Sequence, residues 1–208
     1  MKGNTKENIL RAAIRIFAQK GYKAATVREI MAEAGAKNPS AVTYHFQGKE
    51  NLYQRVLEFM FEDADKFVPQ ADPAAPGPTP EEKLRGFILI YMKVLYVLDT
   101  ELDADLAAIF AKELAHPSPF LPEMVKTYLA PGSRDLQAII RELVGPGASD
   151  AEIRQWEDSI MGQIYYPLFA APLVTALRPD EPPVHQTLEE RAEQIFQFTR
   201  GGLNAMKN

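Results

Sequence analysis

Residues 38–53 read NPSAVTYHFQGKENLY, and this stretch decides the fold that we expect. Asn38 is a favourable N-cap, and Pro39 fits the first helical position, where no backbone N–H is needed. The predicted helix is short and ends near the Gln-Gly pair. Val42 and Phe46 lie four residues apart, a spacing that places both on one face. The stretch therefore predicts a short helix with one apolar face and one small, polar face.

Two further helices are predicted before this one. Residues 5–20 repeat apolar side chains at helical spacing, and Gly21 follows as a residue that tolerates the left-handed conformation. Thr26 and Glu29 have the spacing of a capping box, so a second helix begins there and stops at Gly35. A supporting helix followed by two helices with a short turn is the layout of a helix-turn-helix domain.

The rest of the chain also predicts helices. A fourth helix runs from Lys49 to about residue 67 and is apolar on most sides. A proline-rich break, Pro69 to Pro80, follows it. Five further helices are expected at residues 81–98, 103–115, 120–144, 150–177 and 186–205, with Pro122, Pro131, Pro167 and Pro172 starting, kinking or interrupting some of them. We therefore predict an all-α fold with an N-terminal three-helix helix-turn-helix domain, residues 1–48, and a larger helical domain, residues 49–208.

The composition excludes several kinds of site. The 208 residues contain no cysteine, which excludes a disulfide scaffold, a cysteine-based zinc site and a cysteine nucleophile. The N-terminus lacks the apolar core of a signal peptide, and the apolar stretch Phe87–Leu98 is about half as long as a membrane helix. We therefore expect a soluble, cytoplasmic protein. The net charge of −5 divides into +4 over residues 1–62 and −9 over the remainder. The basic N-terminal part fits an anionic partner. Judged from charge alone, a chance imbalance of surface charges is an equally good explanation.

The polar face of the short helix fits the major groove of DNA. Ser40 and Ala41 are small enough for close approach to base edges, and the Thr43 hydroxyl can bind those edges. Tyr44 and His45 can donate to phosphates at the flanks. Packing on the turn is an equally good interpretation of His45.

Residues 5–53 resemble the N-terminal DNA-binding domain of the TetR family of repressors. The resemblance rests on the segments ILRAAIRIFAQKGYKAATVREIMAEAGA and AVTYHFQGKENLY. It implies phosphate contacts for Tyr44 and Lys49, and a base or phosphate contact for Arg28. The alternative interpretation of Arg28 is a solvated arginine on the surface. The segment AKNPSAVTYH is one residue longer than the commonest family spacing, which leaves open whether Pro39 or Ser40 faces the DNA. The predicted DNA-binding residues are Thr26, Arg28, Pro39, Ser40, Ala41, Thr43, Tyr44, His45 and Lys49.

Later segments resemble the C-terminal domain of the CecR-like subgroup of that family. They read FAKELAHPSPFLPEMVKTYLAPGSRDLQAIIRELVG, GQIYYP and FQFTRGGL. The resemblance implies a ligand-binding and dimerisation domain for a small-molecule effector. We expect this effector to be largely apolar, neutral or cationic, and to contact some of the many large aromatic residues, most of which belong to the core. The predicted ligand-binding residues are Tyr91, Phe110, Glu113, Tyr128, Trp156 and Tyr165.

Two apolar stripes near the C-terminus predict a homodimer. Each stripe repeats at helical spacing, so two helices per chain can pair across a two-fold axis. The alternative is that both stripes serve only the core of one chain. The stripes are Ile153, Trp156, Ile160 and Ile164, and Leu188, Ala192, Ile195, Thr199 and Leu203.

These features predict a sequence-specific transcriptional regulator, a repressor that binds a palindromic operator as a dimer and is released by a small molecule. The alternatives are an all-α enzyme and a helical protein-interaction module with a basic N-terminal lobe. The chain has no fingerprint of a nucleotide-binding loop, a zinc protease or a serine hydrolase, so we expect no enzyme and no cofactor. Glu113 and His116 form one E-x-x-H pair without a second copy, so no metal site is predicted.

Overall fold

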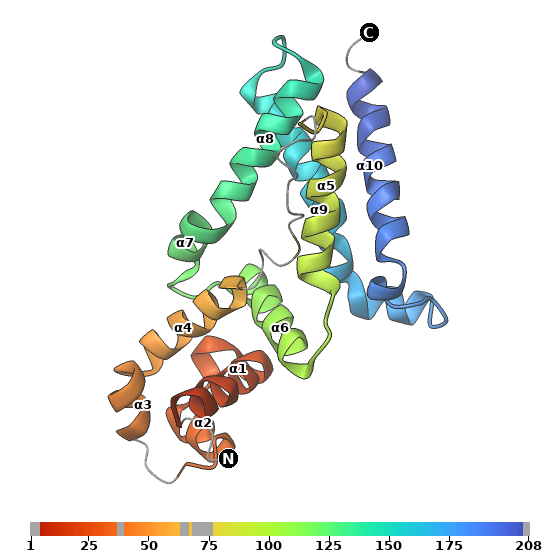
Figure 1. Ribbon diagram of the computed structural model, residues 1–208. Coiled ribbons are helices and arrows are strands. Elements are labelled where there is room, and N and C mark those ends of the chain that lie inside the picture. The colour runs from red at the N-terminus through yellow and green to blue at the C-terminus, as the bar shows by residue number, and fades with distance from the viewer. Residues whose placement is uncertain (1–4, 37–39, 63–66, 68–76, 206–208) are drawn as a thin grey trace. The chain divides into compact units, whose positions relative to one another are not determined.

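The computed structural model of the chain describes residues 5–36, 40–62, 67 and 77–205 (Figure 1). Every regular element in these ranges is a helix, which confirms the predicted all-α fold. In chain order the elements are α1 (Thr5–Ala24), α2 (Val27–Glu33), α3 (Ser40–Phe46), α4 (Lys49–Glu62), α5 (Pro80–Tyr96), α6 (Glu101–Ala115), α7 (Leu121–Met124), η2 (Val125–Leu129), α8 (Ala130–Val144), α9 (Asp150–Leu177), η3 (Val184–Gln186) and α10 (Leu188–Ala205).

The ends of the first helices follow from the sequence. Gly21 interrupts the helical backbone of α1 with a φ of +73°, as expected for a residue without a Cβ. The Glu29 N–H donates to Thr26 Oγ1 at 3.3 Å and the Thr26 N–H donates to Glu29 Oε2 at 3.0 Å, which completes the predicted capping box. Gly35 closes α2 with a φ of +63°. The kink in α1 and both ends of α2 therefore follow from local signals that the sequence carries, and α1 continues past Gly21 to Ala24.

The predicted helix over residues 120–144 is three elements in the structure. Pro122 and Pro131 lie in the first turns of α7 and α8, where a missing N–H costs little. Between these helices the chain forms a π-helical turn, η2. Pro167 and Pro172 lie inside α9, which continues through both. Residues 63–66 of the predicted fourth helix and most of the proline-rich break fall outside the described residues.

The chain divides into two compact units. The head unit contains Met1–Asp65 and Leu98–Thr127, and therefore holds α1 to α4 together with α6 and α7. The body unit contains Lys66–Val97 and Tyr128–Asn208, and therefore holds α5, α8, α9 and α10. The predicted domain boundary at residue 48 rests on the sequence and stays a prediction.

The core of the head unit is built around α1. Its apolar face packs against α2, α4 and α6. Ile9, Ile14 and Phe17 are fully buried there. Helix α3 packs on α4, and its own two buried residues are Val42 and Phe46. Most of the surface of α3 is therefore left for another partner.

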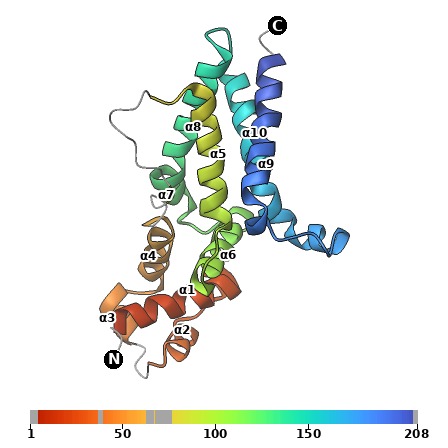
Figure 2. The same ribbon diagram turned by 45° about the vertical axis from the view of Figure 1, so that its right-hand side comes forward.

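The core of the body unit lies between α5, α8, α9 and α10. Helix α10 packs along α5, α5 packs on α8, and α8 packs on α9 (Figures 1 and 2). The stripes predicted to pair across a dimer axis lie in this core. The buried members are Ile153, Ile160, Ile164, Leu188, Ala192, Ile195, Thr199 and Leu203. These side chains therefore join helices of one chain, as in the alternative given for the stripes, and a homodimer built on α9 and α10 stays a prediction.

Helix α9 has a second apolar face that is exposed. Residues 159–177 carry no charged side chain, and this run is longer than the apolar stretch Phe87–Leu98, which Lys93 interrupts. By length and composition α9 is the one helix in the described residues that could cross a membrane, although only 11% of the tested window is buried. The exposed apolar residues, at spacings of three and four along one face, are Tyr166, Phe169, Leu173 and Leu177.

Candidate DNA-binding interface

Helix α3 presents the predicted polar face to solvent. The exposed residues are Ser40, Thr43 and Tyr44, and 83% of the Tyr44 surface is accessible. Val42 and Phe46 are 1% and 6% exposed on the opposite face. A short helix held by two apolar anchors, with hydroxyl groups facing outward, has the shape and chemistry of an element that enters the major groove.

The flanks of this face are partly covered. Ala41 and His45 are half-buried. The His45 ring lies edge-on to the Tyr44 ring, with centroids 4.9 Å apart, and 6.5 Å from the Phe46 ring. His45 therefore packs on its own helix while keeping part of its surface accessible. Pro39 lies outside the described residues, so the register question between Pro39 and Ser40 is not answered.

The two predicted residues at the start of α2 differ in their roles. The Thr26 hydroxyl donates to Glu29 Oε2 at 2.9 Å, so this side chain serves as the helix cap. Lys20 Nζ lies 2.5 Å from the other oxygen of Glu29. The Lys20 contact, followed by the bonds from Thr26, lowers the pKa of Glu29 to about 2. Arg28 is exposed and makes no ion pair within the described residues, and its contact with DNA stays a prediction.

Lys49 is turned toward the interior of the head unit. Its Nζ lies over the Tyr22 ring and donates to the Lys23 carbonyl at 3.4 Å. Burial lowers the pKa of Lys49. The residue thus links the start of α4 to the end of α1, and its predicted contact with a phosphate stays a prediction.

Two of the predicted ligand-binding residues belong to one polar-aromatic cluster in the body unit. Tyr91 of α5 stacks on Phe87, with ring centroids 4.3 Å apart. Burial raises the pKa of Tyr91, and the nearby carboxylates of Asp135 and Glu157 raise it further. Burial raises the pKa of Tyr165 to about 12, and Tyr91 and Glu157 add to the effect. The cluster joins α5, α8 and α9 around the half-buried carboxylate of Glu157.

Glu157 and Gln137 are members of this cluster that the sequence analysis missed. Gln137 Nε2 donates to Glu157 Oε2 at 2.6 Å. Within the described residues, no lysine, arginine or histidine forms an ion pair with Glu157. Its sequence signal is the spacing to Tyr165, two helical turns along α9, which places both near the same face.

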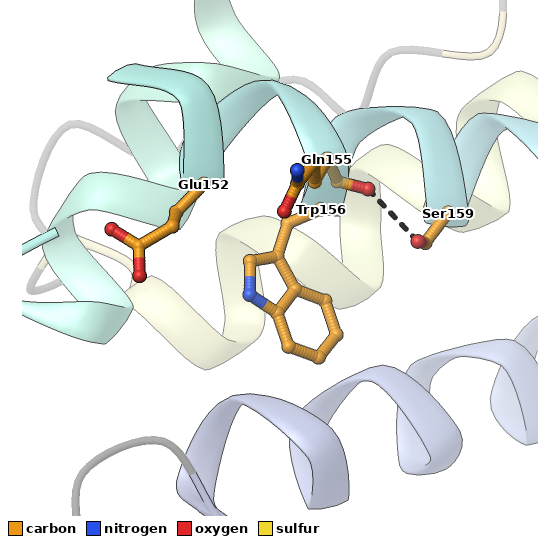
Figure 3. A pocket seen from close by; sticks show the side chains of 4 residues that line it. All are labelled: Glu152, Gln155, Trp156 and Ser159. Atoms are coloured by element: carbon orange, nitrogen blue, oxygen red, sulfur yellow. Dashed lines mark hydrogen bonds between the residues drawn. The ribbon is translucent and has the colours of Figure 1, made fainter. Parts of the chain in front are cut away.

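The other predicted ligand-binding residues have different surroundings. The Trp156 ring points toward α10 and lines a pocket of about 300 Å³ together with Glu152, Gln155 and Ser159 (Figure 3). Tyr128 is half-buried at the end of η2. In the head unit, the Phe110 ring is edge-on to Phe61, 6.5 Å between centroids. Glu113, also in the head unit, is 2% exposed and accepts hydrogen bonds from Tyr53 and Ser118.

The six predicted ligand-binding residues are therefore divided, four in the body unit and two in the head unit. Their role stays a prediction, and Glu113 has internal partners for both carboxylate oxygens. Among the described residues, no group of three or more acidic or histidine side chains is placed to hold a metal ion.

Comparison with known proteins identifies both parts of the chain. The profile of the family described as "Bacterial regulatory proteins, tetR family" matches residues 9–56. The profile described as "HTH-type transcriptional dual regulator CecR, C-terminal domain" matches residues 80–203, which is more than half of the chain. The first profile covers the helices that form the candidate interface, and the second covers α5 to α10.

Individual proteins agree with these profiles. The chain is 26% identical over 142 residues to the probable HTH-type transcriptional regulator YttP of Bacillus subtilis, covering 68% of this chain and 66% of YttP, just under two thirds of its length. It is 27% identical over 165 residues to the HTH-type transcriptional dual regulator CecR of Shigella flexneri, covering 76% of this chain and 73% of CecR.

A solved structure shares the fold. The transcriptional regulator FadR from Bacillus subtilis, in complex with stearoyl-CoA, matches with a TM-score of 0.61 and 18% identity over 94% of this chain and 98% of that one. The two profiles and the curated relatives agree on one class of protein, transcriptional regulators, which is not a class of enzymes. This chain belongs to the TetR family of transcriptional regulators and carries a C-terminal domain of the CecR type.

Proposed function

We propose that this regulator is a repressor that binds a palindromic operator as a homodimer and is released by a small molecule. The observation that carries the proposal is the outward face of α3, where Ser40, Thr43 and Tyr44 stand exposed above the buried Val42 and Phe46. In this proposal Ser40 and Thr43 contact base edges, whereas Tyr44 and Arg28 contact phosphates.

The DNA part of the proposal is tested with duplex DNA at several salt concentrations. Arg28→Ala should weaken binding to all sequences and lower the slope of log affinity against log salt by about one unit, because one phosphate contact is lost. Arg134→Ala is the matched control, because Arg134 is an exposed arginine in the body unit. Equal effects of the two substitutions, or binding that does not depend on salt, would refute the assignment.

The proposed dimer uses the exposed apolar face of α9. Tyr166, Phe169, Leu173 and Leu177 form this face, which we call the α9 seam. The C-terminal part of α9 extends away from α5 and α8 in both views (Figures 1 and 2). The opposite face of α9 already lies in the core of its own chain. The exposed apolar face therefore favours a second copy of the chain as its partner.

The proposed effector site is the cluster of Tyr91, Glu157 and Tyr165. Aromatic rings beside a carboxylate that has no cationic partner among the described residues favour an apolar ligand that carries a positive charge. The ligand must prefer the conformation that binds DNA poorly, because equal affinity for both conformations would shift nothing.

Reciprocal linkage tests the effector site. Hydrophobic aromatic amines are screened for a compound that weakens operator binding, and the operator must then weaken binding of that compound by the same factor. Glu157→Gln should reduce affinity for the amine and leave DNA affinity unchanged in its absence. Amines that bind this unit without any effect on DNA affinity would contradict the proposed release.

A further inference from the structure

A close contact between α5 and α8 lies beside the proposed effector site. Helix α8 packs on α5, and Gly132 of α8 lies against the hydroxyl end of Tyr91. A Cβ at Gly132 would overlap Tyr91 Oη and lie 3.0 Å from Tyr91 Cζ. Gly132 is helical and its φ is not in the left-handed region, so its backbone conformation does not require glycine. Alanine at this position would instead take away the space that the Tyr91 hydroxyl occupies.

The Tyr91 hydroxyl has no hydrogen-bond partner among the described residues. Tyr96, on the same helix, donates from its hydroxyl to the Ile164 carbonyl at 2.7 Å. Tyrosine hydroxyls away from bulk water usually find such a partner. Burial, followed by the carboxylates of Asp135 and Glu157, raises the pKa of Tyr91, so the hydroxyl keeps its proton at neutral pH. Tyr91 therefore holds an unused hydrogen-bond donor within an aromatic cluster.

Two contacts fix the ring that carries this donor. One face of the Tyr91 ring stacks on Phe87, with centroids 4.3 Å apart and the planes 22° from parallel. The tip of the ring lies against the backbone of α8 at Gly132. A ring held at its face and at its tip has little freedom to turn. The position of Tyr91 Oη is therefore defined before any ligand binds, which lowers the entropic cost of binding.

Helix α8 also holds the second polar group of this site. Gln137 Nε2 donates to Glu157 Oε2 at 2.6 Å and lies 3.4 Å from Ser133 Oγ. Ser133 follows Gly132 directly, so the helix that makes room for Tyr91 also carries the partner of Glu157. The site thus offers a ligand one neutral donor and one anionic acceptor, and α8 positions both.

We propose that Gly132 and Tyr91 set the specificity of the effector site: the effector carries a hydrogen-bond acceptor that the Tyr91 hydroxyl binds, in addition to the cationic group that Glu157 binds. This inference rests on the proposed function, because it concerns the same site. Aromatic amines with an ether or carbonyl oxygen belong to this class of ligand, whereas amines built only on hydrocarbon do not. Gly132 is a positioning residue, because it acts through Tyr91.

Binding of paired amines to the full chain tests this specificity. The probes are phenethylamine and its ortho-, meta- and para-methoxy derivatives, titrated without DNA and followed by calorimetry or NMR. The wild type should bind at least one methoxy derivative roughly three- to tenfold more tightly than phenethylamine, the range of one neutral hydrogen bond. Tyr91→Phe should bind phenethylamine as the wild type does and lose the preference. An unchanged preference in Tyr91→Phe would overturn the proposal.

Gly132→Ala tests the positioning role. The added methyl group displaces the Tyr91 hydroxyl without removing it, so the preference should be lost although the donor is still present. Gly86→Ala is the matched control, because Gly86 lies on α5 and a Cβ there would meet nothing within 4 Å. This control should keep the preference of the wild type. A preference that survives in Gly132→Ala, or that is lost equally in Gly86→Ala, would contradict the role of Gly132.

A double-mutant cycle covers the case in which Gly132→Ala disturbs the fold. Gly132→Ala should lower the urea midpoint in the wild type and lower it less in Tyr91→Phe. The reason is that removal of the hydroxyl leaves Tyr91 Cζ, 3.0 Å from the added Cβ, as the nearest atom. Equal shifts of the midpoint in the two backgrounds would mean that Gly132 and Tyr91 do not touch, and would also overturn the proposal.

Failure of this inference and failure of the proposed function give different results. If Glu157→Gln weakens binding of the amines but no methoxy derivative is preferred, the effector site stands and the role of Tyr91 is refuted. If no probe binds, or if Glu157→Gln leaves every affinity unchanged, the proposed effector site is refuted together with this inference. The proposed DNA binding is measured separately, with duplex DNA and no amine.

Discussion

Lys49 Nζ lies 4.7 Å from the centre of the Tyr22 ring. The same ammonium donates to a carbonyl at the end of α1, where the partial negative charge of a helix terminus favours a cation. Lys49 therefore helps to hold the beginning of α4, and with it the α3–α4 turn, against α1. A phosphate contact by this residue would have to share or replace these internal partners.

Lys49→Ala should lower the free energy of unfolding by about 0.5–1 kcal/mol, the range of a partly exposed cation–π contact. If Lys49 also binds phosphate, it should flatten the salt dependence of DNA binding by about one unit. Tyr22→Leu is the control, because it removes the ring and keeps the ammonium. It should lower stability and leave the salt slope unchanged. An unchanged salt slope in Lys49→Ala would assign the residue a structural role only.

Local signals made much of the fold predictable. The capping box at Thr26 and Glu29 and the glycine at residue 35 give α2 its ends, and these signals act within one turn of helix. The exposed and buried sides of α3 also follow from the four-residue spacing of Val42 and Phe46. A spacing fixes which side chains share a face, whatever that face then contacts.

The partner of each face was not predictable from the sequence. The stripe through Ile160 looks the same whether it meets α8 of its own chain or a second copy, and it lies in the core. The hydrogen bond between Tyr53 and Glu113 was likewise not predictable, because it joins positions 60 residues apart. The Tyr91–Glu157 cluster also needs three helices to be placed side by side before it exists.

The capping box of α2 should make the head unit sensitive to acid. The folded state lowers the pKa of Glu29 from 4.5 to about 2, chiefly through Lys20. A depressed carboxyl pKa contributes stability above the unfolded pKa, and this contribution is lost as pH falls from about 4.5 toward 2. The urea midpoint should therefore fall over this pH range by more in the wild type than in Glu29→Gln. Parallel pH curves for the two proteins would contradict the assignment.

Two neighbouring glycines of α10 should respond oppositely to alanine. A Cβ at Gly202 would lie 2.5 Å from Cη2 of Trp156, whereas a Cβ at Gly201 would meet nothing within 4 Å. Gly202→Ala should lower the free energy of unfolding by about 1–3 kcal/mol, the usual cost of overpacking. Gly201→Ala should raise it by up to about 1 kcal/mol, because alanine favours helix. Denaturation by urea measures both changes in the free energy of unfolding. An unchanged free energy of unfolding in Gly202→Ala would mean that the Trp156 ring does not pack against α10 at Gly202.

Leu173→Glu should convert the protein to a monomer. Leu173 is 56% exposed on the α9 seam, so a charge there costs little in the single chain and is buried when two seams meet. Leu98→Glu is the control, because Leu98 is an exposed leucine of the head unit. Sedimentation at micromolar concentration should find dimers for the wild type and Leu98→Glu only. A dimeric Leu173→Glu would place the interface elsewhere.

Selection of duplexes from a random library is the most direct test of the central claim that α3 reads DNA as half of a symmetric dimer. The wild type should enrich a palindrome whose half-site centres lie about one helical turn apart, roughly 34–36 Å, or slightly further. Thr43→Ala should enrich a palindrome with the same spacing and a changed base at one position of each half-site. Enrichment of no sequence, of a single unpaired half-site, or of an identical palindrome by Thr43→Ala and the wild type would contradict the claim.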